Sequence, residues 1–391
     1  MRFPEFHGEW EEHGLSEYLD FKNGLNPDSK RFGKGIKFIS VMDILNNPVI
    51  TYDCIRASVQ ATDAEMSSFS VEYGDILFQR SSETLEDVGR ANVYIDDKVA
   101  VFGGFVIRGK KKANYNPLFF RYLLSSPYAR KRIIPMGAGA QHFNIGQEGL
   151  SKVLLNFPSI EEQTKIASLL HLLDERIATQ SKLIEDLKKL KSAIIVEHYR
   201  QTEKNEVCVA DLGNHFNVGN LAKDDLSETG KPCIIYGELF TTYGEIISQI
   251  ESHTNKTEGM ILSKKGDLLF PSSTTVDAVS LIAPSVINVD NVILGGDMFG
   301  IHINHNYNTQ YLSYYFNHIA KKQLAKFAKG STIIHLHYTD IEKAKLLLPS
   351  LEEQNRMAKC LVALDKKVSV EQNLLSSLTC QKSYLLQQMF I

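Results

Sequence analysis

The sequence of 391 residues lacks the features that tie a chain to a membrane, an oxidising compartment or a metal. Its five cysteines are scattered and form no C-x-x-C pair, so neither a disulfide framework nor a zinc site is expected. No window approaches the roughly 18–20 consecutive apolar residues of a membrane span. The N-terminus has no basic segment followed by an apolar one. We therefore expect no signal peptide, and a cytoplasmic protein with reduced thiols.

An excess of charge of one sign is also missing. The chain has 43 basic and 46 acidic residues, for a formal net charge of −3. Binding of nucleic acid would therefore need a local basic surface. At 43% hydrophobic and 23% charged residues, the composition is that of a folded protein with a core.

Catalytic motifs are absent as well. The sequence has no H-E-x-x-H, no G-x-S-x-G and no G-x-G-x-x-G that opens a helix. It also has no Asn-Pro-Pro-aromatic motif, so this chain is not expected to transfer methyl groups to adenine. Residues 104–110 spell G-x-x-x-x-G-K, but Lys111 follows where a phosphate-binding loop has Ser or Thr, and the intervening residues favour a strand.

Two histidine pairs could suggest a metal, namely His302 with His305 and His335 with His337. Neither pair has a nearby cluster of cysteines or carboxylates, so ordinary surface or hydrogen-bonded histidines are expected. We expect no metal, no cofactor and no catalytic residue.

The chain contains one long internal repeat. Residues 157–163 (FPSIEEQ) recur as 348–354 (LPSLEEQ), at an offset of 191 residues. Residues 74–78 (GDILF) recur as 266–270 (GDLLF) at an offset of 192, and a Gly-Gly pair at 103–104 recurs at 295–296. A period this long indicates a duplicated globular module, because solenoid repeats have periods of about 20–50 residues.

Each repeat ends in a segment with the periodicity of a coiled-coil helix. Ser159 with Glu162, and Ser350 with Glu353, form S-x-x-E capping boxes at the helix starts. Apolar residues then recur in steps of three and four over about 35–40 residues without glycine or proline. The expected core positions are Ile166, Leu170, Leu173, Ile177, Ile184, Leu187, Met357, Leu361, Leu364, Val368, Leu375 and Leu378. The polar interruptions also match, since Gln180 aligns with Glu371 and Lys191 with Lys382.

These patterns predict an α+β fold with two tandem mixed α/β domains. The predicted boundaries are 1–155 for the first domain, 156–201 for the first helix, 202–346 for the second domain and 347–391 for the second helix. Strands are predicted at 36–41, 75–78, 98–108, 233–236, 267–270 and 291–303, and helices at 116–134 and 309–328. The matched helices favour packing against each other as an antiparallel pair with a pseudo two-fold axis. Packing of each helix on its own domain alone is the other interpretation.

The whole layout resembles the specificity subunit of type I restriction–modification systems. The residues that carry the resemblance are the two P-S-[IL]-E-E-Q helix starts, the opening 3–6 (FPEF) with Glu9-Trp10, the Gly-Asp strands and the ending 382–390 (KSYLLQQMF). The resemblance implies that each globular region is a target recognition domain that reads one half of a bipartite site in double-stranded DNA. It implies a coiled coil that acts as a ruler, no catalytic activity, and two methyltransferase subunits with restriction subunits as partners. No membrane partner is implied.

The polar loops after the matched strands, and those before each long helix, supply the candidate DNA contacts. In the first domain these are Lys34, Lys37, Arg80, Ser81, Ser82, Arg90, Gln141, His142 and Asn144. In the second domain they are Ser272, Ser273, Thr274, Thr275, Lys329, Ser331, Thr332, His335 and His337. The run of lysines at 110–112 is typical of a solvated turn, with contact to the DNA backbone as the alternative.

Three other hypotheses stay open. The chain could be a coiled-coil scaffold without sequence readout, an enzyme such as a nuclease with a hidden carboxylate site, or the specificity partner of a methyltransferase–nuclease fusion.

Arginine is distributed unevenly along the chain. Residues 1–200 contain eleven arginines, and residues 201–391 contain only Arg356. Because arginine is the usual reader of guanine, we expect the second half-site to lean towards A·T pairs, or to read any guanine through lysine, histidine or backbone groups.

Overall fold

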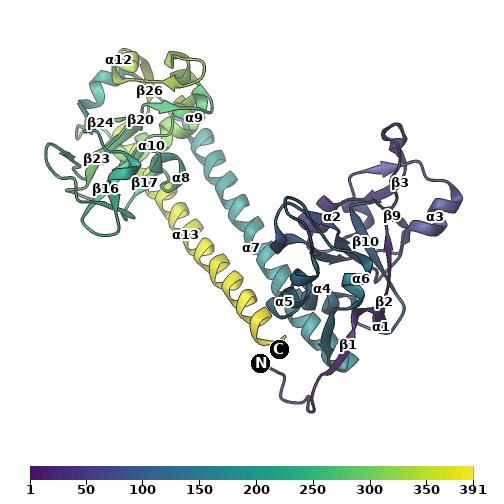
Figure 1. Ribbon diagram of the computed structural model, residues 1–391. Coiled ribbons are helices and arrows are strands. Elements are labelled where there is room, and N and C mark those ends of the chain that lie inside the picture. Colours follow the sequence, from purple (N-terminus) through teal and green to yellow (C-terminus); the bar gives the residue numbers. More distant parts are fainter. Residues whose placement is uncertain (391) are drawn as a thin grey trace. The chain divides into compact units, whose positions relative to one another are not determined.

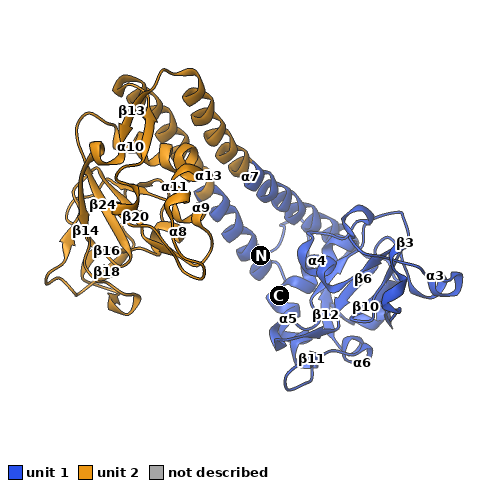
Figure 2. Ribbon diagram, turned by 90° about the horizontal axis from the view of Figure 1, so that it is seen from above, with its two compact units in different colours: residues 1–182, 373–391 blue, residues 183–372 orange. Residues whose placement is uncertain are grey.

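The computed structural model describes residues 1–390 and divides into two compact units. Unit 1 is Met1–Lys182 with Asn373–Ile391, and unit 2 is Leu183–Gln372 (Figure 2). Two long helices, α7 (Ile160–Gln201) and α13 (Leu351–Gln388), each contribute residues to both units (Figure 1). Among the described residues, no helix has both the length and the apolar character needed to cross a membrane.

Unit 1 contains a mixed α/β region of short strands and helices. Its strands are β1 (Glu11–Gly14), β2 (Leu19–Asn23), β3 (Phe32–Ile39), β4 (Ser58–Val59), β5 (Ser70–Val71), β6 (Ile76–Gln79), β7 (Ser81–Ser82), β8 (Ala91–Val93), β9 (Ala100–Phe102), β10 (Val106–Lys111), β11 (Phe143–Asn144) and β12 (Leu154–Phe157). Its helices before α7 are α1 (Leu15–Tyr18), α2 (Val41–Asn46), α3 (Asp63–Phe69), α4 (Pro117–Ser125), α5 (Pro127–Ile133) and α6 (Gln147–Ser151).

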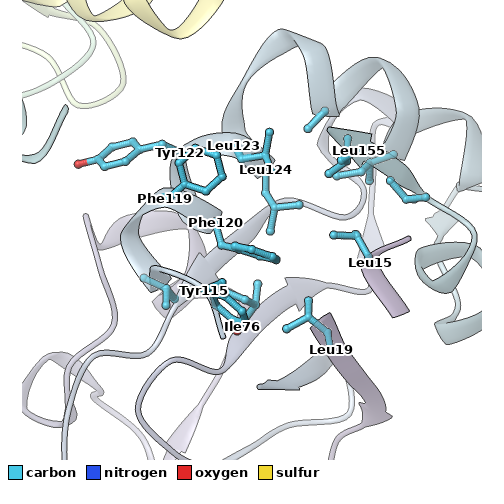
Figure 3. Packing of buried hydrophobic residues seen from close by; sticks show 14 of the residues in the cluster. Leu15, Leu19, Ile76, Tyr115, Phe119, Phe120, Tyr122, Leu123, Leu124 and Leu155 are labelled. Atoms are coloured by element: carbon cyan, nitrogen blue, oxygen red, sulfur yellow. The ribbon is translucent and has the colours of Figure 1, made fainter. Parts of the chain in front are cut away.

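The strands of unit 1 form two four-stranded sheets and two short ribbons. One sheet has the order β2-β10-β6-β8 and the other the order β4-β3-β9-β5, in which β3 and β9 run parallel. Between the first sheet and α4 lies a core rich in aromatic side chains, where Phe120 and Leu124 of α4 lie near Leu15 and Leu19 (Figure 3). The hydroxyl of Tyr122 points away from this cluster.

Unit 2 repeats this arrangement with additional strands. Its strands are β13 (Asn205–Cys208), β14 (Gly213–Asn217), β15 (Leu226–Ser227), β16 (Lys231–Ile235), β17 (Ile246–Ile247), β18 (Ser252–Thr254), β19 (Ile261–Leu262), β20 (Asp267–Pro271), β21 (Ser273–Thr274), β22 (Ser285–Ile287), β23 (Ile293–Gly295), β24 (Met298–Ile303), β25 (Ile334–His335) and β26 (Lys345–Leu348). Its helices before α13 are α8 (Glu238–Thr241), α9 (Ala278–Leu281), α10 (Thr309–Tyr315), a π-helical segment (Phe316–Ala320), α11 (Lys321–Leu324) and α12 (Tyr338–Ile341).

The sheet orders show that the sequence repeat is a repeat of topology. The order β14-β24-β20-β22-β17 in unit 2 matches β2-β10-β6-β8 with one strand added. The parallel pair of β16 and β23 likewise matches that of β3 and β9. The predicted mixed α/β fold with two tandem copies is confirmed.

Some predicted elements are divided. The strand predicted at 98–108 is two strands, β9 and β10, and the strand predicted at 291–303 is β23 and β24. Gly103, Gly104 and Phe105 lie between the first two strands, and Gly296 and Asp297 lie between the other two, where Gly295 ends β23. The helix predicted at 116–134 is α4 and α5, because Pro127 has no amide hydrogen to continue α4.

The helix starts differ from the predicted capping boxes in one detail. The Ser159 hydroxyl accepts a hydrogen bond from the Glu162 amide at 3.3 Å, but the Glu162 carboxylate accepts two hydrogen bonds from Arg2 at 2.7 Å instead of capping the backbone. The Glu353 carboxylate similarly contacts His198 and Arg356. The interpretation of these glutamates as caps was therefore wrong, because a partner side chain reaches each of them.

The glutamine of the repeated motif joins each long helix to its globular region. Gln163 Oε1 accepts a hydrogen bond from the Asn116 amide at 3.1 Å, and its Nε2 donates to the Pro158 carbonyl. Gln354 makes the same two contacts with Asn308 and Pro349. Both glutamines are buried, and each fixes the start of one helix against the start of another.

Within each unit, segments of α7 and α13 pack against each other in antiparallel directions. In unit 1, Asp174 contacts Lys382 while Ile166 and Phe390 share one hydrophobic cluster. In unit 2, Lys191 contacts Asp365 and His198 contacts Glu353. The twelve predicted core positions of these helices are all buried or half-buried.

The helices also complete the cores of the globular regions. Ile166 and Leu170 belong to the main cluster of unit 1, and Met357 and Leu361 belong to that of unit 2. The helices therefore pack against each other as predicted, and each also packs on a globular region, so the interpretation of packing on the domain alone is wrong. Burial of apolar area on both faces stabilises each helix far more than its intrinsic propensity does.

Candidate nucleic-acid interface

Two loops of unit 1 that carry predicted DNA contacts form one polar ribbon. Strand β7 pairs with β11, so that Ser81 lies opposite Asn144 and Ser82 opposite Phe143. The Ser81 hydroxyl donates a hydrogen bond to the Asn144 side chain. Ala138 pairs with Asn144 across the loop that precedes β11. Gln141 and His142 are exposed at the tip of this loop.

Unit 2 has an equivalent ribbon at the matching place. Strand β21 pairs with β25, so that Ser273 lies opposite His335 and Thr274 opposite Ile334. The turn of this ribbon needs glycine, because Gly330 has φ +116° and an added Cβ would lie 2.0 Å from the Ile333 carbonyl oxygen. Ser331 and Thr332 are exposed at the tip.

Both ribbons are attached to the sheet by the same backbone hydrogen bonds. The Arg80 amide donates to the Phe105 carbonyl at 2.9 Å, and the Arg80 carbonyl accepts from Ile145 at 2.9 Å. In unit 2, the Ser272 amide donates to the Asp297 carbonyl at 2.7 Å, and the Ser272 carbonyl accepts from Leu336 at 2.9 Å. Three segments therefore meet in each unit: the ribbon, the end of β6 or β20, and the turn before β10 or β24.

A surface hollow lies beside each ribbon. The hollow of unit 1 has a volume of about 420 Å³, and its lining includes Phe32, Phe38, Met42, Ser81, Gly104 and Phe105. The hollow of unit 2 has a volume of about 410 Å³, and its lining includes His215, Asn217, Ser272, Asp297, His337 and Tyr338. Both hollows include the turn that follows the Gly-Gly pair, but the first extends over Phe32, Phe38 and Met42 and is largely apolar, whereas the second extends over His215, His337 and Tyr338 and mixes polar with apolar groups.

Most of the predicted DNA contacts have side chains that solvent reaches. The exposed candidates are Lys34, Arg90, Gln141, His142, Asn144, Thr275, Lys329, Ser331, Thr332 and His337. The half-buried candidates are Lys37, Arg80, Ser81, Ser82, Thr274 and His335. Their role in DNA binding stays a prediction.

Three candidates are committed to contacts inside the fold. Ser272 and Ser273 are 5% and 4% exposed, and the Ser273 hydroxyl donates to Asp297 at 2.7 Å. Lys37 lies on β3, away from the ribbon, and its ammonium group donates to the Ile55 carbonyl at 2.6 Å. These three side chains make contacts within the fold, and the sequence pattern of a polar loop does not reveal which of its members point inward; their role in DNA binding stays a prediction.

The lysine run at 110–112 lies on and just after β10 and is paired with other groups. Lys110 contacts Glu72 at 3.3 Å, Lys112 contacts Asp20 at 3.1 Å, and Lys111 donates to the Tyr115 carbonyl at 3.1 Å. Residues 106–111 form β10, which confirms that the residues between the two glycines of the G-x-x-x-x-G-K sequence favour a strand.

Apart from Ser81, Ser272 and His337, the sequence reasoning missed the residues that line the hollows beside the ribbons. Phe105 and Asp297 each follow the repeated Gly-Gly pair, which is the signal that could have found them. His215 stacks on Tyr338 with ring centroids 4.3 Å apart, a contact between segments 123 positions apart that no local pattern indicates.

Each unit also has a polar cluster where its globular region meets the helix pair. In unit 1, Asp174 of α7 accepts from the Tyr122 hydroxyl at 2.8 Å and contacts Lys382 of α13 at 2.5 Å and Arg121 at 3.3 Å. Burial raises the pKa of the Tyr122 hydroxyl, and the nearby Asp174 charge raises it further. The tyrosine is therefore a neutral donor to a carboxylate.

The cluster of unit 2 contains the equivalent residues and two additional ones. Lys191 donates to Asp365 at 2.7 Å and to Glu245 at 2.9 Å, and His318 contacts Glu245 at 2.9 Å. Burial raises the pKa of Glu245, but the hydrogen bond with His318 and the charge of Lys191 outweigh it and lower the pKa to about 2. Within residues 1–390, no group of three or more His, Cys, Asp or Glu side chains is placed to hold a metal ion.

Comparison with known proteins agrees with this arrangement. The family model described as "Type I restriction modification DNA specificity domain" matches residues 7–189 and again residues 202–379. The chain is 23% identical to a putative type I restriction enzyme MjaX specificity subunit of Methanocaldococcus jannaschii, covering 93% of this chain and 88% of that protein. It is 21% identical to the type I restriction enzyme MjaVIII specificity subunit of the same organism, covering 94% and 90%.

Solved structures show the same fold. The crystal structure of a type I restriction–modification system S subunit from M. genitalium aligns with a TM-score of 0.60 at 16% identity, covering 100% of this chain and 99% of that one. The two matches of the family model together span most of the chain. This protein belongs to the family of type I restriction–modification DNA specificity proteins.

Proposed function

We propose that this chain is the non-catalytic subunit that gives a type I restriction–modification complex its DNA sequence specificity. Each specificity domain reads one half of a bipartite site in double-stranded DNA. The observation that carries the proposal is the duplicated ribbon, with exposed hydrogen-bonding side chains at the same place in both domains. Asparagine, glutamine, arginine, lysine and histidine are the side chains that read base edges, and the ribbons with their neighbouring loops contain all of these types.

A two-stranded ribbon has a suitable shape for this task. The major groove of B-DNA is about 12 Å wide and admits an α-helix or a two-stranded β-ribbon. The tips at 141–142 and 331–332 are exposed, whereas the bases of the ribbons are attached to buried strands. A rigid base with an exposed tip favours base contacts by the tip and phosphate contacts by neighbouring loops.

We further propose that the long helices fix the number of unspecified base pairs between the half-sites. Helix α7 has 42 residues without a break, which corresponds to about 63 Å at 1.5 Å per residue. One turn of B-DNA is about 34–36 Å, so helix length and groove spacing are of comparable size. Insertion of one heptad into α7 and one into α13 is expected to widen the spacer and leave both half-sites unchanged.

The proposed partners are two adenine methyltransferase subunits and, in the full complex, restriction subunits. Two equivalent surfaces support two copies of one partner, and exposed Leu183 of α7 has its counterpart in exposed Leu374 of α13. A solved structure with a TM-score of 0.60 comes from work on complex assembly of a type I system. A methyltransferase–nuclease fusion would dock on the same surfaces and is distinguished by the partner gene product that copurifies.

Methylome sequencing of a host with and without this chain tests the proposal. A methylated bipartite motif that disappears with the gene is expected. Replacement of residues 1–155 by the matching domain of a relative is expected to change one half-site only. Methylation that persists without the gene, or a motif that changes in both halves after the replacement, would contradict the proposal.

A further inference from the structure

One exposed side chain interrupts a run of buried residues at the same place in both domains. Phe105 is 70% exposed, although residues 100–104 and 106–109 around it are buried. Asp297 is its equivalent at the offset of 192, and it is exposed between buried 292–295 and buried 298–300. The backbone around this position is therefore kept in the duplication, whereas the exposed side chain differs in chemistry.

The turn that presents this side chain is held tightly. An added Cβ at Gly104 would lie 1.8 Å from Asn26 Oδ1, and one at Gly295 would lie 2.2 Å from Leu221 Cβ. The Phe105 and Asp297 carbonyls also accept the hydrogen bonds that attach the ribbons. A side chain presented by a fixed turn loses little backbone freedom on binding, which favours a specific contact.

The position also lies among the predicted DNA contacts. Phe105 lines the hollow of unit 1 together with Ser81, and Asp297 lines that of unit 2 together with His337. The Asp297 carboxylate already accepts from the Ser273 hydroxyl on one oxygen, Oδ2. Asp297 is nevertheless exposed, so its carboxylate keeps acceptor capacity beyond this hydrogen bond.

The chemistry of the two residues restricts what they contact on DNA. Phenylalanine has no hydrogen-bonding group, and its base contact in the major groove is an apolar one with the C5-methyl group of thymine. A carboxylate is repelled by phosphates, so its favourable contact is an amino group on a base edge, such as N4 of cytosine. An apolar and an acidic side chain at equivalent positions therefore suit two different bases.

We infer that positions 105 and 297 are equivalent base-reading positions, at which Phe105 contacts a thymine methyl group in the first half-site and Asp297 accepts a hydrogen bond from a cytosine amino group in the second. This inference rests on the proposed function and deepens it, because it names which exposed residues determine specificity. It also predicts at least one T·A pair in the first half-site and one C·G pair in the second.

The thymine contact is tested with duplexes in which deoxyuridine replaces each thymidine of the first half-site in turn. The full chain in complex with its methyltransferase subunits is used, on the motif found by methylome sequencing. At one position, loss of the methyl group is expected to weaken binding by the wild-type complex about fourfold. The Phe105→Ala complex should bind the thymidine and deoxyuridine duplexes equally at that position.

Tyr73→Ala is the matched control, because Tyr73 is an aromatic residue that is 54% exposed and lies before β6, at the end of that strand away from the ribbon. It should keep the wild-type sensitivity to deoxyuridine. A wild-type complex that binds every deoxyuridine duplex normally would overturn the thymine contact. So would a Phe105→Ala complex that keeps the same sensitivity as the wild type.

The cytosine contact is tested with Asp297→Asn, which keeps an oxygen for the Ser273 hydroxyl but adds a donor that suits adenine. Methylome sequencing should show that one cytosine of the second half-site is now replaceable by adenine, with the first half-site unchanged. An unaltered motif would overturn this contact. A wild-type chain that directs methylation of a bipartite motif would still support the proposed function, so the two failures are distinguishable.

Discussion

The two specificity domains share their sheet order, their ribbon and their attachment to the long helices, but they use charge differently. The first domain places arginines at Arg2, Arg31 and Arg121, where each pairs with a carboxylate. The second domain, residues 202–346, has no arginine, and its Glu245 pairs with His318 and with Lys191 of α7. The common topology shows that packing of apolar strands determines the fold, whereas the charged residues vary around it.

The structure also shows that fewer arginines could contact DNA than their number in the sequence suggests. Arg108 is buried, and Arg130 donates to the Glu86 and Val88 carbonyls. Burial, together with the positive charge of Arg90, lowers the pKa of Arg130 to about 10. Most arginines of the first domain make contacts within the fold. The excess of arginines that the first half of the chain could offer to DNA is therefore smaller than the count of eleven against one suggests. Arg56, Arg80 and Arg90 are the ones at or near the surface.

The largest expected effect is the loss of stability when a buried leucine of α7 or α13 is replaced. It tests whether the stability of the two units depends equally on the long helices. Leu170 and Leu361 are equivalent residues, and both are 0% exposed in the cores of their units. Leu170→Asp and Leu361→Asp are each expected to destabilise by several kcal/mol, because a charge is buried without a partner. Chemical denaturation of the full chain measures this.

The matched control for that comparison is Leu172→Asp, since Leu172 is 64% exposed on the same helix. The same reasoning predicts loss of bipartite methylation for Leu173→Asp and Leu364→Asp, at the half-buried contact positions. Unchanged stability of the Leu361→Asp protein would contradict the role of α13 in the core of unit 2.

The second effect concerns Glu245 and His318, the two residues that the polar cluster of unit 2 has in addition to those of unit 1. Glu245 has a pKa of about 2 in the folded chain, well below the value of about 4.5 for an unperturbed glutamate. Its contribution to stability is therefore fully present above pH 4.5 and is lost as the pH falls through about 2. That contribution is roughly 3 kcal/mol at neutral pH.

Hydrogen exchange of peptides from unit 2, compared between pH 5 and pH 3, measures this loss. Glu245→Gln should weaken protection at pH 5 and flatten the pH dependence between these values. An acid response of the wild type that is identical to that of Glu245→Gln would show that the cluster does not stabilise unit 2.

The third effect is on the salt dependence of DNA binding. A duplex with only the second half-site intact should show a shallower salt slope than one with only the first. Each phosphate contact changes the slope by about 0.9, and the second domain has no arginine and a formal excess of acidic residues. Titrations of the full complex at several salt concentrations measure both slopes. Equal slopes would indicate that lysines replace the arginines fully.

The smallest effect is on base composition. The second half-site is expected to lean towards A·T pairs, with the pair contacted by Asp297 as an exception, because this domain lacks the usual guanine reader. The methylated motif decides this directly. A second half-site made mainly of G·C pairs would contradict the expectation. We expect this effect to be small, because the first domain exceeds the second by fewer surface arginines than the sequence count suggests.

Much of the architecture was predictable because the signals are local and repeated. The 191-residue repeat and the heptad pattern predicted two tandem domains and two long helices, and α7 and α13 extend over 42 and 38 residues. The candidate DNA residues were predicted only as two separate loops in each domain. Pairing of β7 with β11, and of β21 with β25, joins segments about 60 residues apart, and no local periodicity records such a pairing.

The sequence by itself determined the duplication, the mixed α/β class and the helix faces, because each of these depends on the spacing of apolar residues along the chain. Only the tertiary structure decided which polar residues are available. Ser273 is buried against Asp297, while Phe105 is exposed beside the ribbon, in each case against the usual preference of the residue type. Burial of a side chain depends on what distant segments place around it, and that is a property of the folded chain.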